Sequence, residues 1–258
     1  MGDGKCSPGM TGVMTSIDVH SLNSAYDQFI LASDFFERSD YYRQFRDRYV
    51  NTFRWIERHL PRGGALLDIG SGQFAVLCRK LLDARCDVAD IDTRYTDALR
   101  KNGIGFKAVD LSRETVPVDQ PYDMAVMAEV IEHIPTPPHI VFANLKKALR
   151  PGGQLLVTTP NLYRFRNLTR MVTGRRIFDR FVLPAQDRPI GHFLEYAQEH
   201  LEWQVREAGL EIAESSLEQL SWGGSSFSAR VARKLLAPLL KVHPLWRDNI
   251  VIVARRPS

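Results

Sequence analysis

The stretch ALLDIGSGQF, residues 65–74, constrains the fold more than any other part of this 258-residue chain. A short apolar run leads into Asp68, and Gly70 and Gly72 follow before a segment with the composition of a helix. This order predicts a strand, a glycine turn and a helix. The glycines allow the backbone to turn sharply and to approach a ligand closely, and the helix start offers unpaired N–H groups. Asp68 is then a candidate acceptor at the carboxyl end of the strand.

Apolar runs and helical segments alternate after this stretch. This β-α-β alternation predicts an α/β fold with a doubly wound, parallel-rich sheet. The predicted strands after the first are 88–92, 104–109, 122–128, 154–159, 210–220 and 250–253, and the predicted helices include 74–82, 96–102 and 140–149.

Acidic residues follow the predicted strands: Asp68, Asp90 or Asp92, Asp110 and Glu129. In parallel sheets ligands bind beyond the carboxyl ends of the strands, and an acid about 20 residues after the glycine turn contacts a ribose. We prefer Asp90 for that contact because it ends the apolar run more naturally. Asp92 is the alternative, and both acids could instead cap the next helix.

The region before the glycine turn divides into two parts. Residues 1–20 are rich in Gly, Ser and Thr, which predicts a disordered N-terminus. Residues 21–62 are expected to form a helical cap, because apolar residues recur at steps of three and four between 41 and 60. This cap either packs against the domain or covers a ligand. The remainder, 63–258, is expected to be the main domain.

Composition excludes several classes of protein. The chain has no apolar run of about 18 residues and no apolar signal core at its start, so we expect no membrane span. Three cysteines form no motif and fit the reduced cytoplasm. The formal net charge of +4 is too small to indicate a nucleic-acid partner.

Residues 161–195 form a long connection, which we interpret as a lid insert after the fifth strand. Its arginines are Arg164, Arg166, Arg170, Arg175, Arg176, Arg180 and Arg188, and its acids up to residue 190 are Asp179 and Asp187. Such a lid could hold an anionic acceptor or touch an anionic membrane surface, or its charges could simply be solvated. Residues 231–242 are expected to form a basic amphipathic helix, which could pack on the lid, form a dimer contact or rest on a membrane. Nucleic acid is disfavoured because no RNA-binding module accompanies the arginines.

Six segments in order resemble the class I S-adenosylmethionine (SAM)-dependent methyltransferases. They are LLDIGSG (66–72), VADID (88–92), the Asp110-Leu111 pair, YDMAVMAEVIEHI (122–134), LKKALRPGGQLLVTTPN (145–161) and LEWQVREAGL (201–210). The chain is most similar to bacterial small-molecule and glycan methyltransferases of the group that includes the quinone O-methyltransferases. The resemblance implies a Rossmann-like sheet of seven strands, with the last strand, 249–254, antiparallel.

The resemblance also implies a SAM site. It assigns Gly70 and Gly72 to the methionine part, Asp68 to the turn or the amino group, Asp90 to the ribose, Asp110 and Leu111 to adenine, and Ala128 and Glu129 to the border of cofactor and substrate. The family often has a third glycine where this chain has Phe74. We therefore expect the Phe74 side chain to point away from the cofactor, into the seam between helix and sheet.

The segment Glu129-Val130-Ile131-Glu132-His133 carries the candidate chemistry. A helical turn would place Glu129, Glu132 and His133 on one face, where two carboxylates and an imidazole suit a divalent cation. The pattern resembles that of metal-assisted O-methyltransferases, including small-RNA 2′-O-methyltransferases, in which a later histidine corresponds to His192. Three interpretations stay open: a site for Mg²⁺ or another divalent cation built from these four residues, His133 as a metal-free general base, or a structural brace.

These observations predict a cytoplasmic enzyme that transfers a methyl group from SAM to a hydroxyl of a small molecule or glycan. His133, Glu129 and His192 are its candidate catalytic residues. The alternatives are an RNA 2′-O-methyltransferase and a SAM-binding protein without catalysis. The acceptor and the oligomeric state are not predicted.

Overall fold

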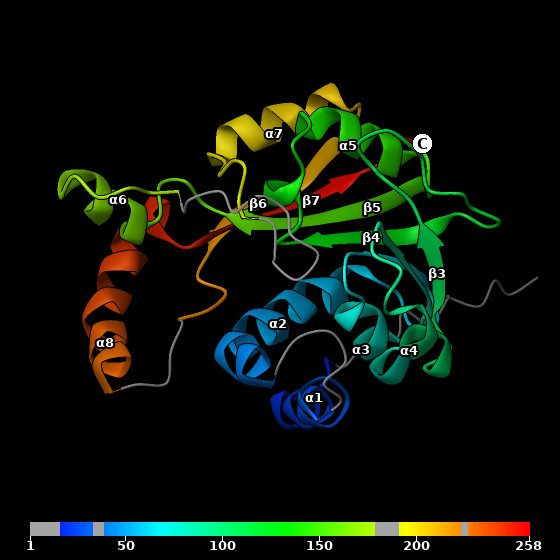
Figure 1. Ribbon diagram of the computed structural model, residues 1–258, viewed down its shortest axis with the longest axis horizontal. Helices are drawn as coiled ribbons and strands as arrows, with labels where there is room; N and C mark the ends of the chain where they lie inside the picture. Colours follow the sequence, from blue (N-terminus) through cyan, green and yellow to red (C-terminus); the bar gives the residue numbers. More distant parts are fainter. Residues whose placement is uncertain (1–15, 33–38, 179–190, 223–226) are drawn as a thin grey trace, which may run out of the picture.

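The computed structural model describes residues 16–32, 39–178, 191–222 and 227–258, and shows one sheet with helices on both faces (Figure 1). The strands are β1 Ala65–Ile69, β2 Arg85–Asp90, β3 Gly105–Ala108, β4 Tyr122–Ala128, β5 Leu149–Pro160, β6 Glu211–Glu218 and β7 Asn249–Arg255. The α-helices are α1 Val19–Tyr26, α2 Ser39–His59, α3 Gln73–Leu81, α4 Thr96–Lys101, α5 Pro138–Lys146, α6 Phe165–Val172, α7 Gln198–Glu207 and α8 Phe227–Val242. Short helical turns are η1 Asp27–Leu31, η2 Ile131–His133 and η3 Pro244–Trp246.

The sheet has the order β3-β2-β1-β4-β5-β7-β6. The pairs from β3 to β5 are parallel, whereas β7 runs antiparallel between β5 and β6. The predicted Rossmann-like sheet of seven strands with an antiparallel last strand is therefore confirmed. Because β7 runs the opposite way, its first residue, Asn249, pairs with Pro160 at the carboxyl end of β5.

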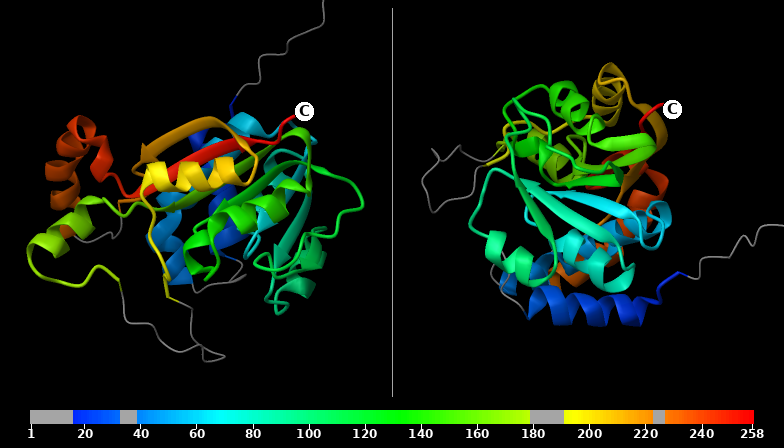
Figure 2. Two further views of the ribbon diagram at one scale, coloured as in Figure 1. Left: turned by 90° about the horizontal axis from the view of Figure 1, so that it is seen from above. Right: turned by 90° about the vertical axis from the view of Figure 1, so that its right-hand side faces the viewer.

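Two apolar cores lie on opposite faces of the sheet, because neighbouring strand residues point to opposite sides. Leu66 packs with side chains of α1, α2 and α3, whereas Leu67 packs with those of α5 and α7. The views at right angles show the same two layers of helices (Figure 2). Strands covered on both faces are apolar almost throughout, which is why β1 and β4 are readable from the sequence.

Some boundaries differ from the sequence prediction. Strand β2 begins at Arg85 rather than at residue 88, because its polar residues have partners: Arg85 pairs with Asp87 at 3.2 Å, and Tyr122 donates to Asp87 at 2.7 Å. Most of the predicted disordered N-terminus lies outside the described residues, but α1 already begins at Val19. Arg180, Arg188, Asp179 and Asp187 of the predicted lid also lie outside them.

Candidate active site

The glycine turn after β1 has the sharp backbone turn that the sequence predicts. Gly70 has φ of +109° and Gly72 has φ of +86°, and residues with a Cβ rarely adopt these backbone conformations. A Cβ on Gly70 would also lie 3.3 Å from Val130 Cγ2. Phe74, in the first turn of α3, is buried, and its ring centroid lies 5.5 Å from that of Tyr49 in α2. Phe74 therefore lies in the apolar core that Leu66 of the sheet shares with α2 and α3, as expected for a side chain in the seam between helix and sheet.

Asp68 at the end of β1 supports the turn. Its Oδ2 accepts a hydrogen bond of 2.9 Å from the Ala75 N–H in the first turn of α3, and the side chain is fully enclosed. Burial raises the pKa of Asp68 to about 7, against the lowering effect of the Ala75 and Phe74 N–H groups. This hydrogen bond braces the strand to the helix, whereas a contact between Asp68 and the amino group of the cofactor stays a prediction.

Replacing Asp68 by asparagine should remove part of the pH dependence of stability. The folded-state pKa near 7 exceeds the unfolded value of about 3.9, so between these values the folded wild type binds more protons than the unfolded chain. The stability of the wild type therefore falls as pH rises through this window, by about 2 kcal/mol between pH 5 and pH 7 relative to D68N. Urea unfolding at both pH values measures this difference.

The matched control for D68N is D97N, because the Asp97 side chain is exposed at the start of α4. D97N should follow the wild type at both pH values. Parallel pH profiles for D68N and the wild type would show that Asp68 is already ionised at pH 5 in the folded protein.

The two acids after β2 differ in their partners. Asp90 ends the strand half-buried, and its Oδ1 accepts the Asp92 N–H at 2.9 Å. Both carboxylate oxygens of Asp92 are bound by the Arg94 side chain, at 2.5 to 3.0 Å. The Asp92 carboxylate is therefore engaged by Arg94. In the contacts described, the Asp90 carboxylate accepts only N–H groups of the local turn, including that of Asp92.

The later positions assigned to the cofactor also lie at this edge of the sheet. Asp110 follows β3, and its Oδ1 accepts from the Ser112 hydroxyl and N–H; Ser112 and Arg113 hold its pKa below the usual range. Leu111 is buried in the core on the α5 face. Ala128 ends β4 half-buried.

Glu129 leaves β4 in a left-handed conformation, with φ of +57°. Its Oε1 accepts from Thr158 Oγ1 at 2.9 Å and Asn249 Nδ2 at 3.1 Å, and its Oε2 lies 3.3 Å from Arg48 Nη1. The helical turn that follows, η2, begins only at Ile131. The prediction that Glu129 shares a helical face with Glu132 and His133 is therefore wrong, because the backbone turns between them.

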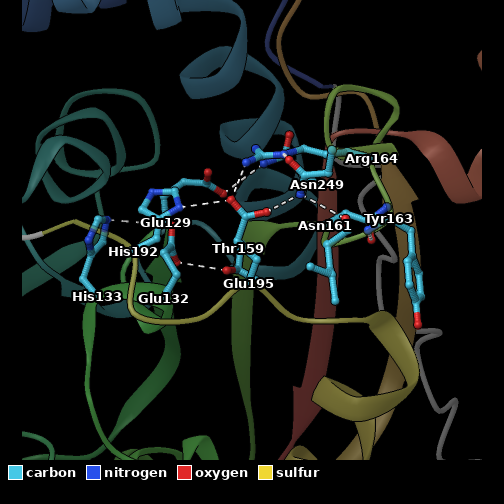
Figure 3. Close-up of polar contacts among 12 residues, drawn as sticks. Glu129, Glu132, His133, Thr159, Asn161, Tyr163, Arg164, His192, Glu195 and Asn249 are labelled. Carbon is cyan, nitrogen blue, oxygen red and sulfur yellow. Dashed lines mark hydrogen bonds and ion pairs between the residues drawn. The ribbon is translucent and has the colours of Figure 1, made fainter. Parts of the chain in front are cut away.

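Glu132, His133 and His192 do converge (Figure 3). One potential ligand atom from each lies within 4.8 Å of the other two, and Glu129 does not belong to this group in the part of the chain that the structure describes. The imidazole rings of His133 and His192 meet edge to face with centroids 4.8 Å apart. His133 Nε2 lies 4.0 Å from Glu132 Oε1. The structure thus brings together three of the four predicted ligands.

Glu132 has an unusual environment for a carboxylate. The side chain is 1% exposed, and its Oε2 accepts from Thr159 Oγ1 at 3.0 Å, while the buried Oε1 has no hydrogen-bond partner among the described residues. Burial, together with the nearby Glu129 charge, raises the pKa of Glu132 well above its usual range. Burying an oxygen without a hydrogen-bond partner costs free energy of folding. We therefore expect a ligand at Oε1 of Glu132.

His192 is held by residues that sequence reasoning missed. Its Nδ1 lies 3.3 Å from Oε1 of Glu195, a buried carboxylate that also pairs with Arg164 and accepts from Asn167 Nδ2 at 2.6 Å (Figure 3). Burial alone would raise the pKa of Glu195, but its hydrogen bond to His192, the Arg164 charge and Asn167 together hold it below its usual range. Nothing in the spacing of Arg164 and Glu195 distinguishes them from the other charges of the predicted lid.

Basic helices flank the site. Helices α6 and α8 lie beyond the end of the sheet where β4 and β5 finish, in both sets of views (Figures 1 and 2). Exposed apolar residues accompany their arginines and lysines, including Val172, Leu235 and Val242, at 72–82% exposure. No described helix has the length and apolar character needed to cross a bilayer. Contact of this surface with an anionic membrane stays a prediction, as does the cytoplasmic location.

Comparison with known proteins agrees with this geometry. Residues 38–215 match the family described as "Methyltransferase domain". The ubiquinone biosynthesis O-methyltransferase of Burkholderia pseudomallei (strain 1710b) is 27% identical over 212 residues, covering 78% of this chain and 87% of that protein. That of Paraburkholderia phymatum is 27% identical over 158 residues, covering 57% of this chain and 66% of its own length.

Two solved structures show the same fold. A SAM-dependent methyltransferase from Mesorhizobium loti has a TM-score of 0.53 and 18% identity, covering 81% of this chain and 98% of that chain. The 1,6-didemethyltoxoflavin-N1-methyltransferase of Burkholderia thailandensis, solved with S-adenosylhomocysteine, has a TM-score of 0.55 and 14% identity, covering 95% and 92%. With the strand order, the glycine turn and the family match, the chain belongs to the methyltransferase domain family and is a class I SAM-dependent methyltransferase, distantly related to the ubiquinone biosynthesis O-methyltransferases.

Proposed function

We propose that this methyltransferase acts on oxygen, at a hydroxyl of a small molecule or glycan, with the help of a divalent cation. The observation that carries the proposal is the convergence of Glu132, His133 and His192 at the carboxyl edge of the sheet. The distant O-methyltransferase relatives favour the same reaction class. Methyl transfer from a sulfonium requires mainly that the acceptor is aligned and its proton removed, and these three residues lie where an acceptor would meet the donor.

The cofactor is proposed to lie across the ends of β1, β2 and β4. Gly70 allows the backbone to approach the methionine part, and Asp90 holds the ribose, because the Asp92 carboxylate is engaged by Arg94. Asp110, with Leu111 beneath it, is proposed to meet adenine. Asp68 acts indirectly, by fixing the turn through the Ala75 N–H.

The three converging residues fit a divalent cation. Glu132 supplies a buried carboxylate oxygen without a partner, and His133 and His192 supply imidazole nitrogens. Imidazole ligands suit first-row transition metals such as Fe²⁺ and Zn²⁺, whereas Mg²⁺ prefers oxygen ligands and water. Of the divalent cations that the sequence left open, we therefore propose a first-row transition metal rather than Mg²⁺.

The chain's own groups then prepare the acceptor. A divalent cation, when bound, lowers the pKa of a hydroxyl that it contacts. Glu132, His133 and His192 would hold the cation beside the acceptor oxygen. Because their ligand atoms are then occupied, the proton of the acceptor passes to water. Glu129 is a positioning residue in this proposal, because Thr158, Asn249 and Arg48 already occupy its oxygens.

The acceptor is proposed to carry an anionic group. Arg166, Arg175 and Arg176 are exposed on and after α6, next to the site, and arginine recognises phosphate and carboxylate groups well. A phosphorylated small molecule or a nucleotide-sugar has this chemistry.

The test is transfer of label from methyl-labelled SAM into a fractionated extract, with and without EDTA. We expect label in small molecules or glycans, loss of label with EDTA, and recovery with Mn²⁺ or Co²⁺ more than with Mg²⁺. Undiminished transfer in EDTA would remove the metal from the proposal, and label in RNA would replace the acceptor class. SAM binding without label in any fraction would favour a binding protein without catalysis.

A further inference from the structure

The environment of Glu195 points to a role beyond simple ion pairing. The residue is 4% exposed, yet three nitrogen-bearing side chains surround its carboxylate. Arg164 pairs with Oε1, Asn167 Nδ2 donates to Oε2 at 2.6 Å, and His192 Nδ1 lies 3.3 Å from Oε1. The nitrogens of Arg164 and Asn167 can only donate, so both carboxylate oxygens of Glu195 act as acceptors. Glu195 is therefore an acceptor towards His192 as well.

We infer that Glu195 is a positioning residue that fixes the proton of neutral His192 on Nδ1 and so leaves the lone pair of Nε2 for the site. The inference rests on the proposed function in taking His192 as a ligand. The position of the proton itself depends only on the protein. In metal sites, carboxylates that hold the second nitrogen of a histidine in this way commonly raise affinity 10- to 100-fold.

The neighbouring histidine is arranged in the same way. His133 Nδ1 lies 3.4 Å from the Gly191 carbonyl, which can only accept, so this ring also carries its proton on Nδ1 when it is neutral. In addition, the Phe193 N–H donates to the Glu132 carbonyl at 2.8 Å. The short segment from Gly191 to Glu195 therefore contacts all three converging residues and orients both imidazoles alike.

The Glu195 carboxylate also links the two ends of the basic segment between β5 and α7. Arg164 lies at the start of α6 and Glu195 just before α7, and a bridge between Asn161 and Tyr196 lies next to them. The buried Arg164–Glu195 pair thus joins the two ends of the chain that leave β5 and enter α7. A change at this pair should reach the chemistry through His192 and not through SAM binding.

Two variants separate positioning from folding. E195Q keeps the shape but gives the side chain a donor as well as an acceptor. The double variant R164M/E195M replaces the buried ion pair by apolar groups of similar volume, which proteins often tolerate without loss of stability. E57Q is the matched control, because Glu57 is also a buried carboxylate paired with an arginine, Arg54 at 2.7 Å, but lies in α2.

The first readout is ¹⁵N NMR of histidine-labelled protein without metal at pH 8.5, where neutral rings report their tautomer. We expect His192 to be protonated on Nδ1 in the wild type and E57Q, and to populate both tautomers in E195Q and R164M/E195M. Protonation of wild-type His192 on Nε2, or an unchanged tautomer in the folded double variant, would overturn the inference.

The second readout is the affinity for Co²⁺, followed by its visible absorption. We expect E195Q and R164M/E195M to bind Co²⁺ about 10-fold more weakly or worse, with SAM affinity unchanged. Wild-type affinity for Co²⁺ in both variants would contradict the positioning role. If the wild type bound no metal, the metal in the proposed function would fail, and the NMR result would still decide the role of Glu195.

Discussion

Replacing Glu132 by glutamine is expected to abolish high-affinity binding of Mn²⁺ or Co²⁺ and to slow methyl transfer on the order of 10²- to 10³-fold. The physical reason is that Glu132 supplies the anionic ligand among the three converging residues, and its Oε1 has no hydrogen-bond partner in the described part of the chain. Loss of metal stabilisation of a developing oxyanion amounts to several kcal/mol, and each 1.4 kcal/mol is about tenfold in rate. Single-turnover transfer of labelled methyl, at saturating SAM, measures the effect.

The stability of E132Q should distinguish a functional residue from a structural brace. The substitution removes a buried carboxylate that is only half satisfied, so the free energy of unfolding should stay equal to that of the wild type or rise. A brace would behave in the opposite way and lose stability. E207Q, an exposed position at the end of α7, is the matched control and should change neither quantity. Transfer by E132Q at the wild-type rate would remove Glu132 from the chemistry.

The sequence was sufficient for the parts of the site that depend on local order. The glycine turn, the acids at the strand ends and the Glu132-His133 pair all lie within a few residues of a strand that the sequence predicts. His192 was reachable only through family resemblance, because it is distant along the chain from His133. The resemblance also predicted the antiparallel β7.

The parts that the sequence did not predict depend on contacts between distant segments. Arg48 and Glu129 are 81 residues apart, and Arg164 and Glu195 are 31 apart, so no periodicity links them. The wrong prediction for Glu129 has a local cause: a 3.6-residue period was assumed across a position whose φ is +57°. The sequence alone does not distinguish a buried charged residue on an amphipathic helix, such as Arg48, from a solvated one, because burial depends on what the fold packs against it.

Replacing Arg48 by methionine is expected to destabilise the protein by about 3 kcal/mol. Arg48 Nη1 faces Glu129 Oε2 at 3.3 Å, its Nη2 donates to the Tyr41 hydroxyl at 2.7 Å, and its guanidinium lies 4.5 Å from the Phe45 ring centroid. The two charges are only 17% and 13% exposed. Removing one partner leaves the Glu129 carboxylate buried without its counter-charge, and urea unfolding measures that loss.

A double-mutant cycle tests whether the pair itself is responsible. R48M/E129Q should recover much of the loss caused by R48M, because no unpaired charge is left buried, and the coupling energy should exceed about 1 kcal/mol. R46M is the matched control on the same helix: Arg46 pairs with Asp27 at 2.7 Å, but both side chains are at least 35% exposed, so its loss should stay within about 1 kcal/mol. Equal losses in R48M and R46M would contradict the argument.

The same pair ties the cap to the site, so R48M should also weaken SAM binding. Glu129 holds a strained backbone conformation that persists only when its surroundings fix it, and the fixing groups come from α2, β5 and β7. Without Arg48, the Glu129 carboxylate keeps Thr158 and Asn249 of its described partners, and the end of β4 that borders the proposed cofactor site is less firmly held. Calorimetric titration with S-adenosylhomocysteine should therefore show weaker binding by R48M than by R46M, and partial recovery in R48M/E129Q. Unchanged affinity in R48M would mean that α2 stabilises the domain without shaping the site.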